Sequence, residues 1–331
     1  MPTATVEAPS NIALIKYWGA EDLDRAVPYA PSLSMTLRSC RTRTTVEFSE
    51  GDDSADEVFV AEENGTLQPA DEAFRMPVVE HLDRLRDWTG RSGACRVATR
   101  NSFPSGAGIA SSASGFAALT LAAVRALGRT PDAAERSVLA QRSGSGSAAR
   151  SVQGGYVEWP RGDEGSAVQL FADDHWDLRN VIAVVETEPK AVSSREGHRR
   201  APTSPFFETR LNHLNRRLET VRAALQDRDM TRLGDAVERE GIELHIIAMS
   251  SRPPIYYWRP ATLAVLEAVR DLRGTGVAAY ATMDAGANVH VICSPEAEPQ
   301  VAERLEALPE VHYTIRDGVG KGPTTDVPSL L

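Results

Sequence analysis

The stretch NSFPSGAGIASSASGFAAL, residues 101 to 119, joins a run of small residues to an amphipathic helix. From Ser112 onward, apolar residues recur at helical spacing before Gly128 ends the pattern, at Phe116, Leu119, Ala123, Val124 and Leu127. Because small residues precede the helix, the backbone N–H groups of a tight loop and of a helix N-terminus can converge on one point, which suits a phosphate group. The loop lacks the Gly-Lys-Ser/Thr ending of a Walker A sequence, and glycines alone more often mark a packing turn.

The length and composition describe an ordinary globular protein. A chain of 331 residues exceeds the usual size of a single core, so two domains that share one cleft are expected. The net charge of −10 provides no basic field of the kind that holds nucleic acid, so no nucleic-acid partner is expected. A small anionic substrate stays open, because local lysines and arginines can reverse the field inside a pocket.

The chain carries no sign of a membrane segment, a secretory signal or a cysteine framework. No apolar run is long enough to span a bilayer, and the start MPTATVEAPS lacks a basic segment followed by an apolar one. We therefore expect a cytoplasmic protein with no membrane partner. Cys40, Cys95 and Cys293 are widely spaced and odd in number, which predicts buried thiols and neither disulfides nor a zinc site.

The first half of the chain alternates strand and helix signals. Residues 43–50 alternate as a strand does, residues 58–67 predict a β-hairpin around Asn64-Gly65, and Thr130-Pro131 predicts the N-cap and first turn of a helix. Residues 181–187 predict a buried strand. We expect the domain boundary directly after it, which gives domains 1–187 and 188–331.

The second half predicts a small α/β layer domain. Two long helices are expected, one on a stripe from Leu211 to Leu225 and one over residues 231–249. The remaining expected elements are a helix from about residue 260, strands at 277–283, 288–293 and 311–315, and a helix that starts at Ser294-Pro295.

The segment from Pro104 to Ala113 resembles the phosphate loop of the GHMP kinase superfamily. Other segments are similar to the mevalonate diphosphate decarboxylase family, namely NIALIKYWG (11–19), SGSGSAARSVQGGYVEW (143–159), RPPIYY (252–257) and AYATMDAGAN (279–288). The resemblance therefore spans most of the chain.

This resemblance implies an α+β fold of two domains. The N-terminal domain would be like the second domain of ribosomal protein S5 and would bind ATP, the C-terminal domain would be ferredoxin-like, and the active site would lie between them. The family uses ATP and Mg2+ to phosphorylate the tertiary C3 hydroxyl of a 5-phosphorylated mevalonate, and then loses carboxylate and phosphate together. Its members are usually homodimers.

The resemblance also assigns catalytic residues. Asp284 corresponds to the aspartate that orients or deprotonates the C3 hydroxyl, Lys16 to a lysine near the γ-phosphate, and Arg150 to the arginine that meets the substrate carboxylate or orients the aspartate. Their chemistry fits, since a carboxylate can take a proton and a guanidinium can grip a carboxylate. From local sequence alone, these would read as a turn aspartate, a surface lysine and a solvent-facing arginine.

The binding residues follow in the same way. Substrate-binding positions are Tyr17, Ser145, Ser147, Arg150, Ser193 and Ser194, with the choice between the last two left open. ATP-binding positions are Asn101, Pro104, Ser105, Gly106, Gly108, Ala110, Ser111 and Ser112. Ser112 is also the expected Mg2+ contact. His245 and His290 lack a second ligand at metal spacing and are interpreted as structural.

Two departures from the family pattern bear on the substrate. Ala20 stands where a lysine ordinarily helps to hold the diphosphate, and Ala30 and Pro31 replace polar residues of the segment before Ser32. Since an underpaired diphosphate is costly, 5-phosphomevalonate is slightly favoured over 5-diphosphomevalonate. Arg195, Arg199 and Arg200 form a charge run that is solvated by default but could close over a phosphate. The alternatives are a kinase that phosphorylates mevalonate without decarboxylation and a noncatalytic nucleotide-binding protein.

Overall fold

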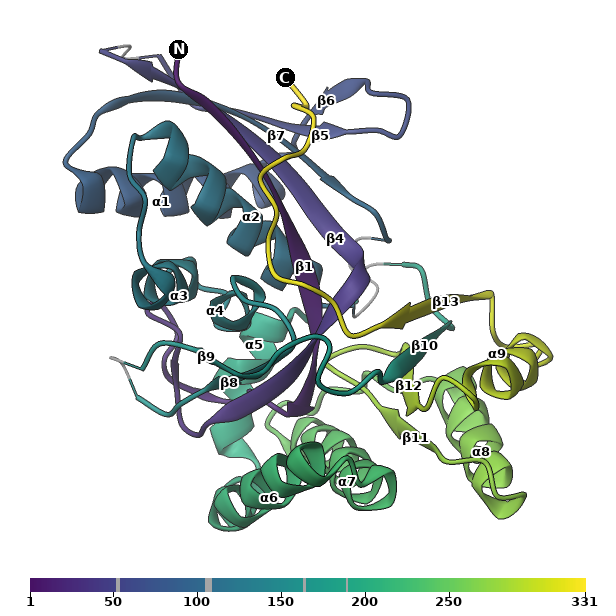
Figure 1. The fold of residues 1–331 in the computed structure, drawn as a ribbon. Coiled ribbons are helices and arrows are strands. Elements are labelled where there is room, and N and C mark those ends of the chain that lie inside the picture. Colours follow the sequence, from purple (N-terminus) through teal and green to yellow (C-terminus); the bar gives the residue numbers. More distant parts are fainter. Residues whose placement is uncertain (52–53, 105–108, 163–164, 189) are drawn as a thin grey trace.

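The computed structural model describes residues 1–51, 54–104, 109–162, 165–188 and 190–331, which form two large sheets flanked by helices (Figure 1). A small two-stranded sheet is formed by β2 (Ala20–Asp22) and β3 (Val27–Pro28). The first sheet is built on two long antiparallel strands, β1 (Thr3–Ile15) and β4 (Ser32–Glu50). Its path runs β6-β5-β7-β4-β8-β9, and β1 pairs with β4 beside this path. The other strands are β5 (Glu57–Ala61), β6 (Leu67–Pro69), β7 (Gly93–Asn101), β8 (Tyr156–Trp159) and β9 (Val168–Phe171).

Helices cover one face of the first sheet. They are α1 (Glu72–Thr89), α2 (Ser111–Ala126), α3 (Ala133–Gln141) and α4 (Ala148–Ser151) (Figure 1). The alanine-rich α2 packs directly on β1 and β4, because small side chains allow a helix to approach a sheet closely. The expected helix from Ser112 and the hairpin at residues 58–67, formed by β5 and β6, are therefore confirmed.

The second sheet is antiparallel throughout, in the order β11-β12-β10-β13. Its strands are β10 (Arg179–Val184), β11 (Ala279–Thr282), β12 (Val289–Cys293) and β13 (Tyr313–Gly318). Its helical part comprises α5 (Ser194–Arg200), the 3-10 turn η1 (Ala201–Thr203), α6 (Phe207–Asp227), α7 (Met230–Ser250), α8 (Pro260–Gly274) and α9 (Glu298–Glu306). The α6, α7 and α8 helices and these strands match the predicted elements.

The two sheets share one hydrophobic core. Buried residues of β1 and β4, among them Leu14 and Met35, lie in one cluster with Ile182 of β10 and with Leu214 and Leu218 of α6. Figure 1 shows α6 and α7 below the lower ends of β1 and β4, and the C-terminal segment running back along β1. Glu7 and Thr324 form an antiparallel bridge there. Helix α7 packs against both β1 and β11, so it places the ends of these two strands near each other.

The domain boundary after residue 187 stays a prediction, and strand β10 before it pairs with β12 and β13 of the second sheet. Two expectations about helix starts need correction. Helix α3 is capped by Asp132 and not by Thr130, because the Asp132 carboxylate accepts from the N–H of Glu135 and completes a capping box. Helix α9 begins at Glu298, since residues 294–297 form a turn before it.

The burial of the three cysteines agrees with the sequence analysis. Cys40, Cys95 and Cys293 are free and buried. Within the described ranges, no helix combines the length and the apolar character needed to cross a membrane.

Candidate active site

The central feature of the site is an ion pair between Lys16, just after β1, and Asp284, in the turn between β11 and β12. The Nζ atom of Lys16 donates to Oδ1 of Asp284 and to the carbonyl oxygen of Ala13, each over 2.7 Å. The lysine side chain is 1% exposed whereas the aspartate is 23% exposed, so the carboxylate forms the open side of the pair. Burial lowers the pKa of Lys16, while the charges of Asp284 and Glu240 act in the opposite direction.

The backbone of Lys16 is held from behind by a buried charge cluster. Its N–H donates to Oε1 of Glu240 over 3.1 Å, and its carbonyl accepts from Nη2 of Arg210 over 3.0 Å. Glu240 on α7 also pairs with Arg210 and Arg217 on α6, and Arg217 reaches Glu243 as well. Glu240 and Arg210 are almost fully buried. Helices α6 and α7 therefore position the lysine through its main chain.

Arg150, on the short helix α4, is held by neutral oxygen atoms alone. Its guanidinium donates to Oγ of Ser32 over 2.5 Å, to Oγ of Ser34 over 3.0 Å, to Oδ1 of Asn11 over 3.2 Å and to Oγ of Ser147 over 3.4 Å. Burial lowers the pKa of Arg150 to about 10, which still leaves it charged at neutral pH. A buried cation with no ion pair in the described part of the chain is suited to an anionic ligand.

The loop before α4 connects this cluster to the phosphate-loop helix. The Ser145 hydroxyl donates to Oγ of Ser112 over 3.3 Å, and the Asn11 side chain donates to the carbonyl of Ser147. Tyr17 lies against Trp159, with ring centroids 5.0 Å apart, beside Gly146. Tyr17, Ser145 and Ser147 are thus brought next to Arg150, as the family resemblance implied.

The residues after β10 add two cations that face the site. Lys190 donates to Oγ of Ser194 over 2.7 Å and to the carbonyl of Ala285 over 2.8 Å. Burial lowers the pKa of Lys190 to about 8, and the charge of Asp284 opposes this shift. Arg195 lies beside Gly144 and pairs with Asp24 over 2.5 Å.

The two predicted serines of this segment have different surroundings. The Ser193 hydroxyl caps α5, because it accepts from the N–H of Glu196 over 3.2 Å. The Ser194 hydroxyl oxygen instead accepts a hydrogen bond from the Lys190 ammonium group. Of the three arginines in this charge run, Arg199 and Arg200 turn toward Glu196 and leave Arg195 as the member near the site.

The predicted ATP-binding residues gather at the start of α2. Asn101 ends β7 and accepts from the hydroxyl of Thr42 over 2.6 Å, and Ala110 precedes α2 in a left-handed conformation. Ser10 of β1 donates to the carbonyls of Ile109 and Ala110 and ties the loop to the sheet. Pro104 is the last described residue before the gap, and the predicted positions Ser105, Gly106 and Gly108 lie outside the described residues.

A pocket of about 350 Å³ opens beside this helix start. Its polar lining residues include Asn101, Ser111 and Ser112. Its apolar lining residues include Val60, Phe74, Pro77 and Phe116. A mostly apolar pocket with a few polar groups beside a phosphate loop suits a purine base and its ribose.

Among the described residues there is no group of three or more His, Cys, Asp and Glu side chains that could cage a metal. Mg2+ in nucleotide enzymes is held mainly by phosphate oxygens and water, with one or two protein oxygens, so the exposed Ser112 hydroxyl fits this role. His245 and His290 are buried, and burial lowers the pKa of His245 to about 3 and that of His290 to about 4. Both therefore stay neutral, which agrees with a structural role.

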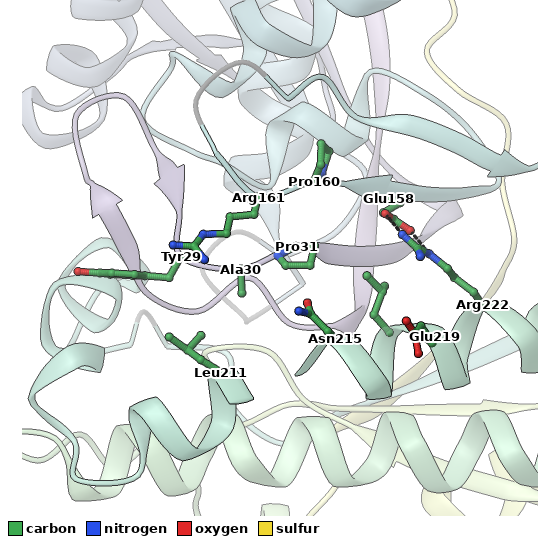
Figure 2. A pocket seen from close by; sticks show the side chains of 11 residues that line it. Tyr29, Ala30, Pro31, Glu158, Pro160, Arg161, Leu211, Asn215, Glu219 and Arg222 are labelled. Carbon is green, nitrogen blue, oxygen red and sulfur yellow. Dashed lines mark hydrogen bonds and ion pairs between the residues drawn. The ribbon is translucent and has the colours of Figure 1, made fainter. Parts of the chain in front are cut away.

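Ala30 and Pro31, which replace polar residues of the family pattern, lie in a different part of the structure. They line a separate pocket of about 480 Å³ between α6 and the β8–β9 turn, where Glu158 and Arg222 form an ion pair (Figure 2). None of the predicted site residues lines this pocket. Among the described residues, the structure therefore gives Ala30 and Pro31 no contact with the catalytic cluster, whereas Ser32 and Ser34 of the same segment do bind Arg150.

Several site residues were missed by the sequence analysis. Around Arg150 they are Asn11, Ser32 and Ser34, and behind Lys16 they are Glu240 and Arg210. Lys190 lies beside Ser194. The last is His198 on α5, whose Nδ1 accepts a hydrogen bond from the N–H of Gly19. Asn11, Ser32 and Ser34 stand inside segments that carried the family resemblance or its departures, which was the available signal. The others lie in helices or loops whose local pattern is that of ordinary core or surface.

Comparisons with known proteins agree with this geometry. Residues 8–169 match the model of the diphosphomevalonate decarboxylase-like N-terminal domain, and residues 180–325 match that of the mevalonate 5-diphosphate decarboxylase C-terminal domain. The diphosphomevalonate decarboxylase mvd1 of Aspergillus fumigatus is 34% identical over 92% of this chain and 80% of its own length. The phosphomevalonate decarboxylase of Haloferax volcanii is 34% identical over 91% of each chain.

Solved structures show the same relationship. Mevalonate diphosphate decarboxylase from Staphylococcus aureus superimposes with a TM-score of 0.90 and 31% identity, over 98% of this chain and 97% of that one. MDDEF in complex with MVAPP, AMPPCP and magnesium superimposes with a TM-score of 0.89 and 35% identity, over 97% of this chain and 98% of that one. The chain therefore has the two-domain α+β GHMP kinase fold and belongs to the mevalonate diphosphate decarboxylase family of ATP-dependent decarboxylases.

Proposed function

We propose that this enzyme uses ATP to phosphorylate the C3 hydroxyl of a 5-phosphorylated mevalonate and then releases CO2 and phosphate. The observation that carries the proposal is the pairing of Asp284 with Lys16 beside the buried cation Arg150, which has no ion pair among the described residues. A carboxylate can accept a proton from a hydroxyl, and a buried guanidinium can bind a carboxylate. A 3-hydroxy acid presents both groups on neighbouring carbons.

In this mechanism Asp284 acts on the hydroxyl. The hydroxyl oxygen attacks the γ-phosphoryl group of ATP, and its proton passes to the Asp284 carboxylate, leaving ADP and a tertiary phosphate ester. The bond from C2 to the carboxylate carbon then breaks as the C3–O bond breaks. The released electron pair forms the double bond, and CO2 and phosphate depart. Lys16 and Arg150 stabilise the charges that develop in these steps.

We infer that ATP binds with its base in the pocket of about 350 Å³ and its phosphates at the start of α2. The hydrogen bond from Ser145 to Ser112 joins this region to the loop that carries Arg150, so nucleotide and substrate would meet there. Ser112 would contact Mg2+, which supplies neutralisation of the phosphate charge. The MDDEF complex with AMPPCP and magnesium supports the same ligand set.

We infer that 5-phosphomevalonate is the preferred substrate. Ala20 offers no cation, Arg195 is partly neutralised by Asp24, and Arg199 and Arg200 face Glu196. Lys190 and Arg195 therefore remain as the nearby cations among the described residues, with Ser194 as the hydroxyl that faces the phosphate. The phosphomevalonate decarboxylase of H. volcanii supports this substrate, whereas the diphosphomevalonate decarboxylase of A. fumigatus supports the diphosphate.

The test compares mevalonate, its 5-phosphate and its 5-diphosphate, with release of ADP and of CO2 measured in parallel. We expect equal amounts of ADP and CO2 from the 5-phosphate, with isopentenyl phosphate as product and a lower kcat/KM for the 5-diphosphate. Release of ADP without CO2 would establish a kinase, and no ADP from any substrate would establish a noncatalytic nucleotide-binding protein. We also propose a homodimer, as the family resemblance implies, which sedimentation equilibrium tests.

A further inference from the structure

The imidazole of His198 lies against the segment that carries the main departure from the family. Its Nδ1 accepts a hydrogen bond of 3.0 Å from the N–H of Gly19, the residue directly before Ala20. His198 belongs to α5, the same short helix that carries Ser194 and Arg195. The ring therefore connects the segment that ends at the position of the absent lysine to the helix that carries the residues proposed to face the 5-phosphate.

Packing fixes the orientation of this ring. The Tyr17 ring lies 4.1 Å from it at an interplanar angle of 33°, and the Trp18 ring lies 4.9 Å from it. The preceding residue is Gly197, where an added Cβ would lie 2.2 Å from the Trp18 ring, so α5 approaches Trp18 as closely as only a glycine allows. The ring is therefore presented to its surroundings in one orientation.

The hydrogen bond to Gly19 also determines the tautomer. Because Nδ1 accepts an N–H, it carries no proton, and a neutral ring then carries its proton on Nε2. Burial and the positive charges of Lys190, Arg150, Arg210 and Arg195 lower the pKa of His198 to about 3. The ring is thus a neutral N–H donor at physiological pH.

The Nε2–H group of His198 is free to donate a hydrogen bond to a ligand, as far as the described residues show. Nε2 of His198 makes no hydrogen bond within the described part of the chain, and it is not sealed from solvent, unlike the unpartnered Nε2 atoms of His245 and His290. An oriented N–H group that is surrounded by cations and has no internal acceptor is suited to an oxygen of an anionic ligand.

We propose that His198 is a substrate-binding residue whose Nε2–H donates to the 5-phosphate, at the place where the family uses a lysine at position 20. This inference rests on the proposed function, since it names a contact of the same substrate. A neutral donor adds a hydrogen bond without adding a charge. The site is thereby matched to one phosphate rather than two, which explains how the chain dispenses with the lysine.

The test is His198→Met, which removes the donor and keeps a side chain of similar volume. We expect the Kd of 5-phosphomevalonate, measured by calorimetry, to rise about tenfold or more. Mevalonate, which lacks the phosphate, is the matched control ligand, and its Kd should stay within about twofold. An unchanged Kd for 5-phosphomevalonate overturns the proposal. An equal loss for both ligands also overturns it, because it would show that the variant disturbs the Gly19 loop.

A second measurement observes His198 itself in the unsubstituted enzyme. The ring nitrogens of His198 in the intact enzyme are observed by NMR, assigned by the signals that disappear in His198→Gln. We expect one protonated Nε2 between pH 5 and 8, and a displaced Nε2 resonance when 5-phosphomevalonate is added. A ring that titrates near pH 6.5, or an Nε2 signal that does not respond, overturns the proposal. Since both experiments measure binding alone, they are independent of whether the wild-type enzyme releases CO2.

Discussion

The Lys16 ammonium and the Asp284 carboxylate lie 2.7 Å apart although 268 residues separate them in the chain. Lys16 follows β1 of the first sheet, and Asp284 follows β11 of the second. The pair therefore exists because the shared core, together with α6 and α7, brings the two sheets together. The geometry of the Lys16–Asp284 pair thus depends on the packing between the two sheets.

Asp284→Asn should abolish decarboxylation and leave ATP binding intact. The amide keeps the shape of the side chain but cannot accept the hydroxyl proton, so kcat should fall at least about a hundredfold. A fluorescent ATP analogue, titrated into both proteins, should show Kd values within about twofold. Turnover within threefold of the wild type would remove Asp284 from the mechanism.

Arg150→Lys tests the role of the planar guanidinium. A lysine keeps the charge but cannot reach Ser32, Ser34 and Asn11 together, so the cation would be misplaced and kcat/KM should fall about a hundredfold. Arg199→Lys, on the exposed side of α5, is the matched control and should leave kcat/KM unchanged. Equal kcat/KM values for the two variants would show that the guanidinium of Arg150 is not needed for catalysis.

The lowered pKa of Lys190 predicts that kcat/KM falls at basic pH. Its pKa of about 8 means that the ammonium group loses its proton as the pH rises through this value, so kcat/KM for 5-phosphomevalonate should decline above about pH 8. Lys190→Arg stays charged throughout, and its profile should remain level to at least about pH 9.5. A limb at the same pH in both proteins would show that another group titrates.

Ala20→Lys tests whether the missing cation sets the substrate. A new ammonium facing a second phosphate gains a charge-assisted hydrogen bond of about 1.5 to 3 kcal/mol. The ratio of kcat/KM for the 5-diphosphate to that for the 5-phosphate should therefore rise about tenfold or more. Because both substrates share one reacting centre, a general effect on chemistry leaves the ratio fixed. A fixed ratio would thus contradict the role given to position 20.

Glu240→Gln should destabilise the protein, because it leaves the buried Arg210 without its carboxylate. Breaking a buried ion pair costs about 3 to 5 kcal/mol, which urea denaturation would show as a lower midpoint. Glu243→Gln is the matched control, since Glu243 binds the same Arg217 but is 28% exposed, and its cost should stay below about 1 kcal/mol. Equal midpoints for the two variants would contradict a stabilising role of the buried Glu240–Arg210 ion pair.

The elements that the sequence predicts well are those with a strong local pattern. The helix α2 after the small-residue loop, the stripes of α6 and α7 and the strands β11 and β12 all follow from hydrophobic spacing within each segment. The boundary errors arose where a competing cap or turn decided the outcome, as with Asp132 before α3. Family motifs, which are also local in sequence, named Asp284, Lys16 and Arg150.

The sequence by itself determined which residue types are available for catalysis and most of the secondary structure that carries them. Only the tertiary structure decided that β10 joins the second sheet, that Glu240 clamps Lys16 and that His198 stands beside Ala20. The physical reason is that these contacts join residues far apart in the chain. Their formation depends on how the shared core packs, and hydrophobic periodicity within one segment carries no record of the segment that it will meet.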